Sequence, residues 1–60
     1  MLNDKVYITC YGRREAYNRQ DAIKEFFEAV QCCEGSEQER YVNIYCALLN
    51  GETEIVDLVD

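Results

Sequence analysis

The apolar positions of this chain recur first with the period of a strand and later with that of a helix. Along Lys5–Tyr11, successive residues alternate between two faces. The two sets are Val6, Ile8 and Cys10, and Tyr7, Thr9 and Tyr11. Gly12-Arg13 fits the two-residue loop of a type II′ turn, which predicts a returning strand over Arg14–Tyr17. In that register Tyr17 faces Ile8 and joins the inner face.

Two amphipathic helices are predicted after the hairpin. Asn18 is a suitable N-cap for a first helix from about Arg19 to Cys33. Ser36 and Glu39 have the spacing of a capping box, and Gly51 suits the left-handed residue that follows a helix. These signals predict a second helix between Ser36 and Gly51. The connection around Gly35 is so short that the two helices should fold back on each other as an αα-hairpin.

The tail Glu52–Asp60 holds Ile55, Val56, Leu58 and Val59, and their spacing suits either a last strand or a frayed helical turn. A strand is predicted because Thr, Ile and Val dominate the tail. The expected order is therefore β-β-α-α-β, within a single small α+β domain spanning residues 1–60. We expect a three-stranded antiparallel sheet with the αα-hairpin packed on one face. The predicted core consists of Val6, Ile8, Tyr17, Ile23, Phe26, Phe27, Val30, Tyr41, Ile44, Tyr45, Leu48 and Ile55.

The formal net charge is −6, from 6 Lys and Arg against 12 Asp and Glu. This balance argues against general nucleic-acid binding, which depends on neutralising phosphates. No apolar run is long enough to span a membrane, and the first five residues lack the layout of a signal peptide. We therefore expect a cytoplasmic protein with no membrane contact.

Neither a metal site nor a catalytic constellation is indicated by the cysteines and acids. The 4 cysteines include no Cys-x-x-Cys pair, and the chain has no histidine, so four free thiols and no cofactor are expected. A thiol-dependent enzyme is the least favoured alternative. Its candidate nucleophile is Cys10, because Arg13 and Arg14 follow it closely in the sequence.

The outer face of the sheet is the candidate binding surface. It is predicted to carry Tyr7, Thr9, Tyr11 and Arg14, which are residue types that protein interfaces favour. Its partner would be another protein or a second copy of this chain. Two other interpretations stay open: single-stranded nucleic acid stacked on Tyr7 and Tyr11 beside Arg14, or ordinary cross-strand packing.

Three stretches of the second helical region resemble a pattern found in short uncharacterised proteins. The stretches are Glu34–Tyr41, Asn43–Tyr45 and Leu48–Gly51, and Tyr17 and Asp21–Ile23 also fit. Those proteins are encoded on conjugative transposons and related mobile elements of clostridia and other Gram-positive gut bacteria. The resemblance covers Val6–Asp57 and implies a mobile-element accessory protein, without implying any activity or site. The function expected overall is that of a non-enzymatic accessory protein that binds a protein partner.

Overall fold

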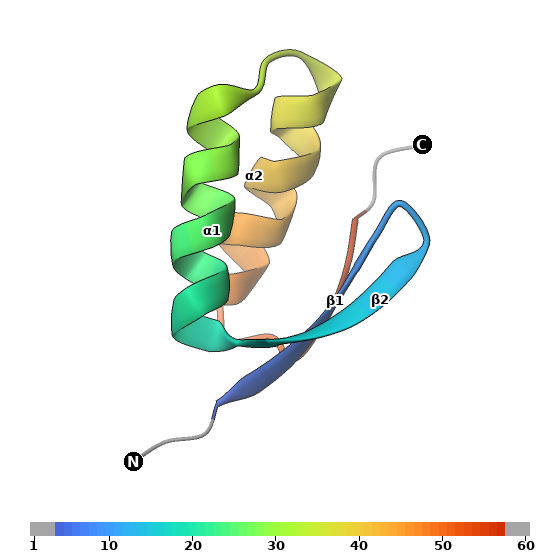
Figure 1. The fold of residues 1–60 in the computed structure, drawn as a ribbon, viewed down its shortest axis with the longest axis vertical. Helices are drawn as coiled ribbons and strands as arrows, with labels where there is room; N and C mark the ends of the chain where they lie inside the picture. Colours follow the sequence, from blue (N-terminus) through green and yellow to red (C-terminus); the bar gives the residue numbers. More distant parts are fainter. Residues whose placement is uncertain (1–3, 58–60) are drawn as a thin grey trace.

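The computed structural model describes residues 4–57 of the chain. Its elements, in order, are β1 (Lys5–Cys10), β2 (Arg13–Asn18), α1 (Arg19–Cys32), α2 (Ser36–Leu49) and β3 (Glu54–Val56). This order confirms the predicted α+β class and the β-β-α-α-β sequence of elements. Both helices lie on the same side of the strands (Figure 1). The predicted strand contributions of Leu58 and Val59 lie outside the described residues.

The β1–β2 hairpin turns one residue earlier than the sequence predicted. Its two-residue loop is Tyr11-Gly12, and both residues have positive φ, 56° and 78°, as a type I′ turn requires. The predicted pairing of Ile8 with Tyr17 is therefore wrong, because Val6 pairs with Tyr17. When the turn of a hairpin moves by one residue, the partner of each β2 residue moves by two residues along β1. For the residues within β1 and β2, the predicted inner and outer faces therefore survive this shift in register.

Helix α1 begins where its sequence signal placed it. The Asn18 side chain accepts a hydrogen bond of 3.0 Å from the Gln20 amide, which confirms the predicted N-cap. Asp21 lies in the first turn, where the helix dipole favours a carboxylate. The helix ends at Cys32, one residue before the predicted end.

Helix α2 begins differently from the prediction and ends as predicted. Gly35, not Ser36, is the N-cap, and no side chain caps the helix, so the predicted Ser36/Glu39 capping box is wrong. The Glu39 amide instead donates to the Gly35 carbonyl at 3.1 Å, which places Ser36 already inside the first turn.

A Schellman motif closes α2, and Gly51 is the residue that makes it possible. The Gly51 amide donates to the Leu48 carbonyl and the Glu52 amide to the Ala47 carbonyl, both at 3.2 Å. Gly51 has a φ of 88°, a conformation that side chains disfavour. The predicted role of this glycine is confirmed.

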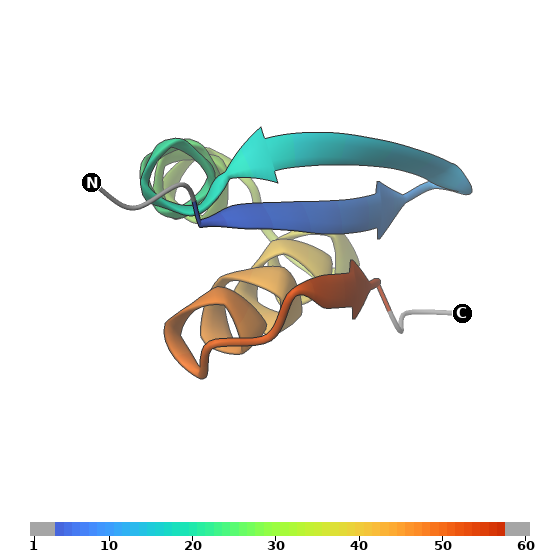
Figure 2. The ribbon, with the colours of Figure 1, turned by 90° about the horizontal axis from the view of Figure 1, so that it is seen from below.

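The sheet is mixed, which corrects the expected antiparallel arrangement. Its order is β2-β1-β3, and β1 pairs antiparallel with β2 but parallel with β3 (Figure 2). The cause is the helix pair. β2 ends beside the start of β1, α1 leaves from that end, and α2 returns the chain to it. A strand that starts there and lies beside β1 must run parallel to it.

The core lies between the sheet and the helices and is smaller than predicted. Its buried residues are Val6, Ile8, Ala22, Phe26, Ile44, Leu48 and Ile55. Phe27 is 45% exposed, so its assignment to the core is wrong. The small side chain of Ala22 is fully buried instead, because α1 presents this position to its neighbours. The other predicted core residues are only half-buried: Tyr17, Ile23, Val30, Tyr41 and Tyr45.

Arg19 fastens the start of α1 to the end of α2. Its guanidinium donates to the Leu48 carbonyl at 2.7 Å and to the Glu52 carbonyl at 2.9 Å. It also forms an ion pair with Asp4. A cation against the last carbonyls of a helix satisfies acceptors that have no partner within the helix and complements its dipole. The loop that leads into β3 is thereby held against the base of both helices.

Candidate functional site

The outer face of the sheet gathers most of the residues predicted for it. Thr9 on β1 pairs with Arg14 on β2 and with Val56 on β3, and Tyr7 pairs with Glu54. Paired residues share a face, so Tyr7, Thr9 and Arg14 lie together as expected. Whether they bind a partner stays a prediction.

Arg14 is engaged within this face. Its guanidinium donates two hydrogen bonds of 2.8 Å to the Glu54 carboxylate and lies 4.2 Å from the centroid of the Tyr7 ring. The hydrogen bond raises the pKa of Arg14 and lowers the pKa of Glu54. The positive charge of Arg14 is therefore already balanced by Glu54 on β3.

Tyr11 does not lie on the outer face, which corrects its predicted position. Its hydroxyl donates to the Glu37 carboxylate, and its ring lies 4.1 Å from the guanidinium carbon of Arg40. Both partners belong to α2, which packs on the inner side of the sheet. The positive φ of Tyr11 breaks the alternation of β1 and turns this side chain toward the helix. The predicted pair of stacking tyrosines is thus separated.

The site around Tyr11 is a link between three elements. Arg40 forms an ion pair with Asp57, and these side chains are only 16% and 9% exposed. The Asp57 carboxylate also accepts a hydrogen bond of 3.1 Å from the Tyr11 amide. We call Tyr11, Arg40 and Asp57 the turn latch, because they join the hairpin turn, α2 and the residue after β3.

Cys10 lies beside the turn latch, in a setting that disfavours a thiolate. Burial raises the pKa of the Cys10 thiol, and the nearby Asp57 and Glu37 carboxylates raise it further, against an opposing effect from Arg40. A reactive cysteine needs a lowered pKa. The predicted electropositive surroundings are therefore absent, although Arg13 and Arg14 are close in sequence. Cys10, Cys32, Cys33 and Cys46 are all free thiols.

The arginines outside the outer face are also paired with acids. Arg13 lies 3.2 Å from Glu15, and Arg19 and Arg40 have the partners described above. Nucleic-acid binding relies on cations that can reach phosphates. On the outer sheet face, Arg14 is bound to Glu54, and Lys5 is an exposed cation on the same face of β1 as Tyr7 and Thr9.

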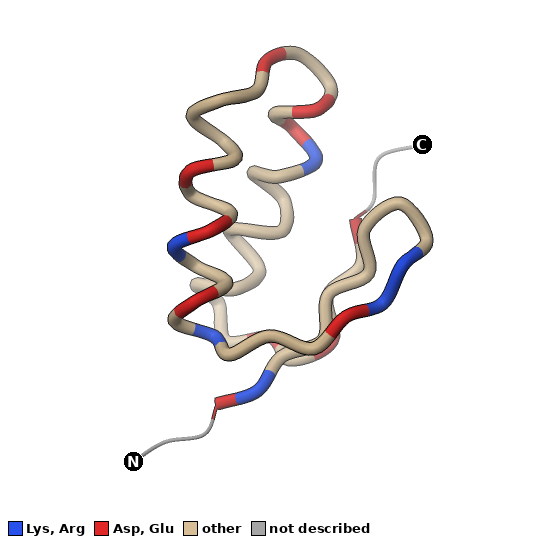
Figure 3. The backbone as a smooth tube through the Cα atoms, in the orientation of Figure 1, with Lys and Arg blue, Asp and Glu red and all other residues tan. Residues whose placement is uncertain are grey.

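A different surface, on the helices, was not singled out by the sequence analysis. Phe27 on α1 and Tyr45 on α2 pack ring against ring, with centroids 5.6 Å apart. Leu49, one turn after Tyr45, is 59% exposed. We call Phe27, Tyr45 and Leu49 the helix strip. The signal that could have revealed it is the absence of any charged residue from Tyr41 to Gly51, which Figure 3 shows as an uncoloured C-terminal half of α2.

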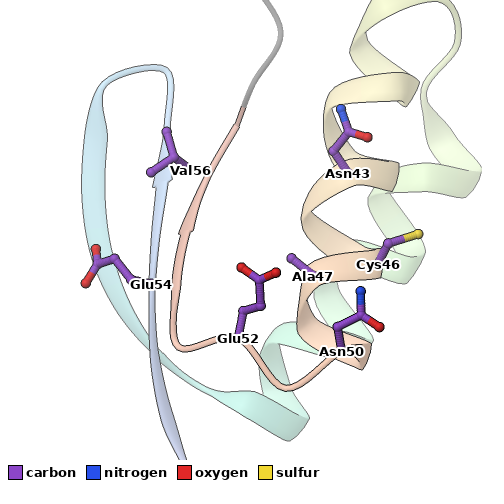
Figure 4. A pocket seen from close by; sticks show the side chains of 7 residues that line it. All are labelled: Asn43, Cys46, Ala47, Asn50, Glu52, Glu54 and Val56. Atoms are coloured by element: carbon purple, nitrogen blue, oxygen red, sulfur yellow. The ribbon is translucent and has the colours of Figure 1, made fainter.

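A shallow hollow lies on the other flank of α2, beside β3 (Figure 4). Its lining is Asn43, Cys46, Ala47, Asn50, Glu52, Glu54 and Val56. The Ala47 and Glu52 side chains point into the space between the helix and the strand. The hollow is open, apolar atoms form more of its surface than polar atoms do, and the charged residues that line it are Glu52 and Glu54.

Over residues 4–57, neither helix has the length and apolar character that crossing a bilayer requires. The same part of the chain contains no group of three or more His, Cys, Asp or Glu side chains placed to hold a metal ion. Comparisons with protein families, with curated proteins and with solved structures gave no match.

Proposed function

We propose that this protein is a small non-enzymatic binding module that acts through a protein partner. The observation that carries the proposal is the helix strip, in which Tyr45 and Leu49 on the charge-free half of α2 lie beside the Phe27 ring of α1. Interface cores are depleted in charge and enriched in aromatic residues. Charged residues make up 30% of this chain, so a charge-free helical surface contrasts with the rest of the molecule.

The helix strip supports this function better than the outer sheet face does. Tyr7 and Arg14 are already in contact with each other, and Arg14 is held by Glu54. A partner at that face would have to compete with a satisfied ion pair. The rings of Phe27 and Tyr45, in contrast, contact each other and leave much of the strip open to solvent. Hydrophobic area of this kind is released from water on binding.

The alternatives have weaker support. Binding of single-stranded nucleic acid by Tyr7, Tyr11 and Arg14 would require the two tyrosines on one surface, and Tyr11 contacts α2 instead. A thiol-dependent reaction at Cys10 would require a lowered pKa, and its surroundings raise it. An accessory role on a mobile element stays a prediction from the resemblance, and it is compatible with a binding module.

The experiment compares two double variants with the wild-type protein. Tyr45→Ser with Leu49→Ser removes two of the three side chains of the helix strip, and Tyr7→Ala with Thr9→Ala alters the outer sheet face. Each purified protein is immobilised, proteins captured from the source cells are quantified, and self-association is measured by light scattering. Both variants must first show cooperative unfolding.

We expect the helix-strip variant to capture at least tenfold less of a specifically bound protein than the wild type does, or to show a dimer fraction at least tenfold lower. The sheet-face variant should match the wild type in both measurements. If instead the sheet-face variant loses capture and the helix-strip variant retains it, the partner binds at the outer sheet face. Equal capture by all three proteins would contradict a role for either surface.

A further inference from the structure

β3 is an edge strand, and within residues 4–57 the backbone groups on its open side have no partner. The Thr53 carbonyl accepts from the Tyr7 amide at 2.8 Å, and the Asp57 amide donates to the Thr9 carbonyl at 3.0 Å. Backbone groups alternate in direction along a strand, so the amides and carbonyls of Glu54 and Val56 point away from β1. Within residues 4–57, no hydrogen bond engages these four groups on the open side.

The open edge borders the hollow between β3 and α2, and the helix side of this hollow has a regular arrangement. Asn43, Ala47 and Asn50 are spaced four and three residues apart, so they form one column along α2. Seven residues of helix rise about 10 Å, which matches about three residues of an extended chain. An extended segment beside β3 would therefore run along the whole column.

The chemistry of the column suits a peptide backbone. Each asparagine side chain offers an amide donor and a carbonyl acceptor, the complement of the groups on the far edge of an added strand. Ala47 lies between them and leaves space, and Figure 4 shows its methyl group directed toward β3. A fourth strand would thus find backbone partners on one side and amide side chains on the other.

The charges that line the hollow favour a basic segment as its ligand. The charged residues that line the hollow are Glu52 and Glu54, and Glu54 is bound by Arg14. The Glu52 carboxylate points into the hollow. A second copy of this chain would bring the same acidic edge, from a molecule of net charge −6, and would be repelled. A basic segment would be attracted.

We propose that the β3 edge and the Asn43–Ala47–Asn50 column bind an extended segment of a protein partner that carries Lys or Arg near Glu52. The segment adds to β3 as a fourth strand. This inference rests on the proposed function, that the protein acts through a protein partner, and it adds the chemical class of the ligand and the mode of recognition.

The test uses a phage-displayed library of random heptapeptides, selected against the full-length chain. Affinities of the enriched peptides are then measured by fluorescence polarisation. Val56→Pro removes an outward amide from the β3 edge while keeping the ladder to β1. Ala16→Pro is the matched control, because Ala16 alternates with the inward-bonded Glu15 and Tyr17 and so points to the open edge of β2. Glu52→Lys reverses the charge in the hollow, and Glu28→Lys, on α1, makes the same change in net charge elsewhere.

We expect enriched peptides with an excess of Lys or Arg and of β-branched residues. Val56→Pro and Glu52→Lys should each weaken binding at least tenfold, and Ala16→Pro and Glu28→Lys should change it by less than twofold. Titration of the labelled wild-type protein should shift the amide signals of Glu54 and Val56, a readout that does not require any variant to fold.

The proposal is overturned if no peptide is enriched, if Val56→Pro binds as the wild type does, or if the amide shifts fall elsewhere. Peptides that bind only the helix strip, and are lost in the Tyr45→Ser, Leu49→Ser protein, would overturn the β3 site and leave the proposed function intact. If partner capture is unchanged in the helix-strip variants and in the β3 variants, the result contradicts both the β3 site and the proposed function.

Discussion

Arg14 and Glu54 form an ion pair that crosses the central strand of the sheet. They belong to the two edge strands, β2 and β3, and are joined by two hydrogen bonds of 2.8 Å, while the Arg14 guanidinium lies over the Tyr7 ring on β1. One side-chain pair therefore ties the short strand β3 to the hairpin on the outer face. Both side chains are about half-exposed, at 54% and 53%, so salt should weaken the pair.

The first prediction concerns the pH dependence of this pair. The hydrogen bonds from Arg14 hold the pKa of Glu54 below its usual value. The folded protein therefore binds fewer protons there than the unfolded chain does. The contribution of the pair to stability is complete above the usual pKa and is lost as the pH falls through the lowered folded pKa. Urea unfolding at a series of pH values should show a steeper acid loss for wild type than for Glu54→Gln. Parallel acid profiles would contradict the prediction.

The second prediction concerns the start of α2. Ser36 makes no capping hydrogen bond and lies within the first helical turn. Alanine favours a helix interior more than serine does. Ser36→Ala should therefore change the free energy of unfolding by less than about 0.5 kcal/mol. Asn18→Ala is the matched control and should cost about 1 kcal/mol, because Asn18 does cap its helix. Similar losses in the two variants would mean that Ser36 acts as a cap in solution.

The sequence was most informative where structure is local. Asn18 and Gly51 act through hydrogen bonds to residues close in the chain, so their roles could be predicted from residue type and spacing. The Ser36 signal was equally local and was wrong, because Gly35 occupies the N-cap position that the pattern assigned to its neighbour. A capping pattern identifies a helix start to within about one residue only.

What the sequence could not supply was long-range geometry. The direction of β3 relative to its neighbour depends on which edge it joins, since beside β2 it would be antiparallel and beside β1 it is parallel. No residue of β3 encodes that choice. Tyr11 was misplaced for a related reason: its contacts with Glu37 and Arg40 come from a helix that follows much later in the chain. The candidate site inherited this error, because Tyr11 was assigned by alternation alone.

The third prediction concerns the thiols. Burial and the neighbouring carboxylates raise the pKa of Cys10, whereas Cys32 and Cys46 are exposed. At about pH 8, iodoacetamide should modify Cys32 and Cys46 well before Cys10, because the thiolate is the reacting form. Peptide mass spectrometry after timed quenching measures the order, with the denatured protein as the control. Faster reaction at Cys10 than at Cys46 would revive the thiol-dependent alternative.

The fourth prediction concerns Tyr11, whose backbone is strained and whose side chain is bound. A left-handed conformation costs a non-glycine residue about 1–2 kcal/mol. The contacts with Arg40 and Glu37 offset this cost. Tyr11→Ala should lose the contacts and keep the strain, whereas Tyr11→Gly should lose the contacts and relieve it. The Ala variant should therefore be less stable than the Gly variant by about 1 kcal/mol.

Urea unfolding of the wild-type, Tyr11→Ala, Tyr11→Gly and Tyr11→Phe proteins measures these differences. The Phe variant keeps the ring over Arg40 and loses only the exposed hydrogen bond to Glu37, so it should stay close to the wild type. Asp57→Ala, which leaves Arg40 without its partner in a mostly buried site, should cost more than the Phe variant, about 2–3 kcal/mol. If Tyr11→Ala were as stable as Tyr11→Gly, the turn would not hold a left-handed residue here. The side chain would then be free to return to the outer face of the sheet.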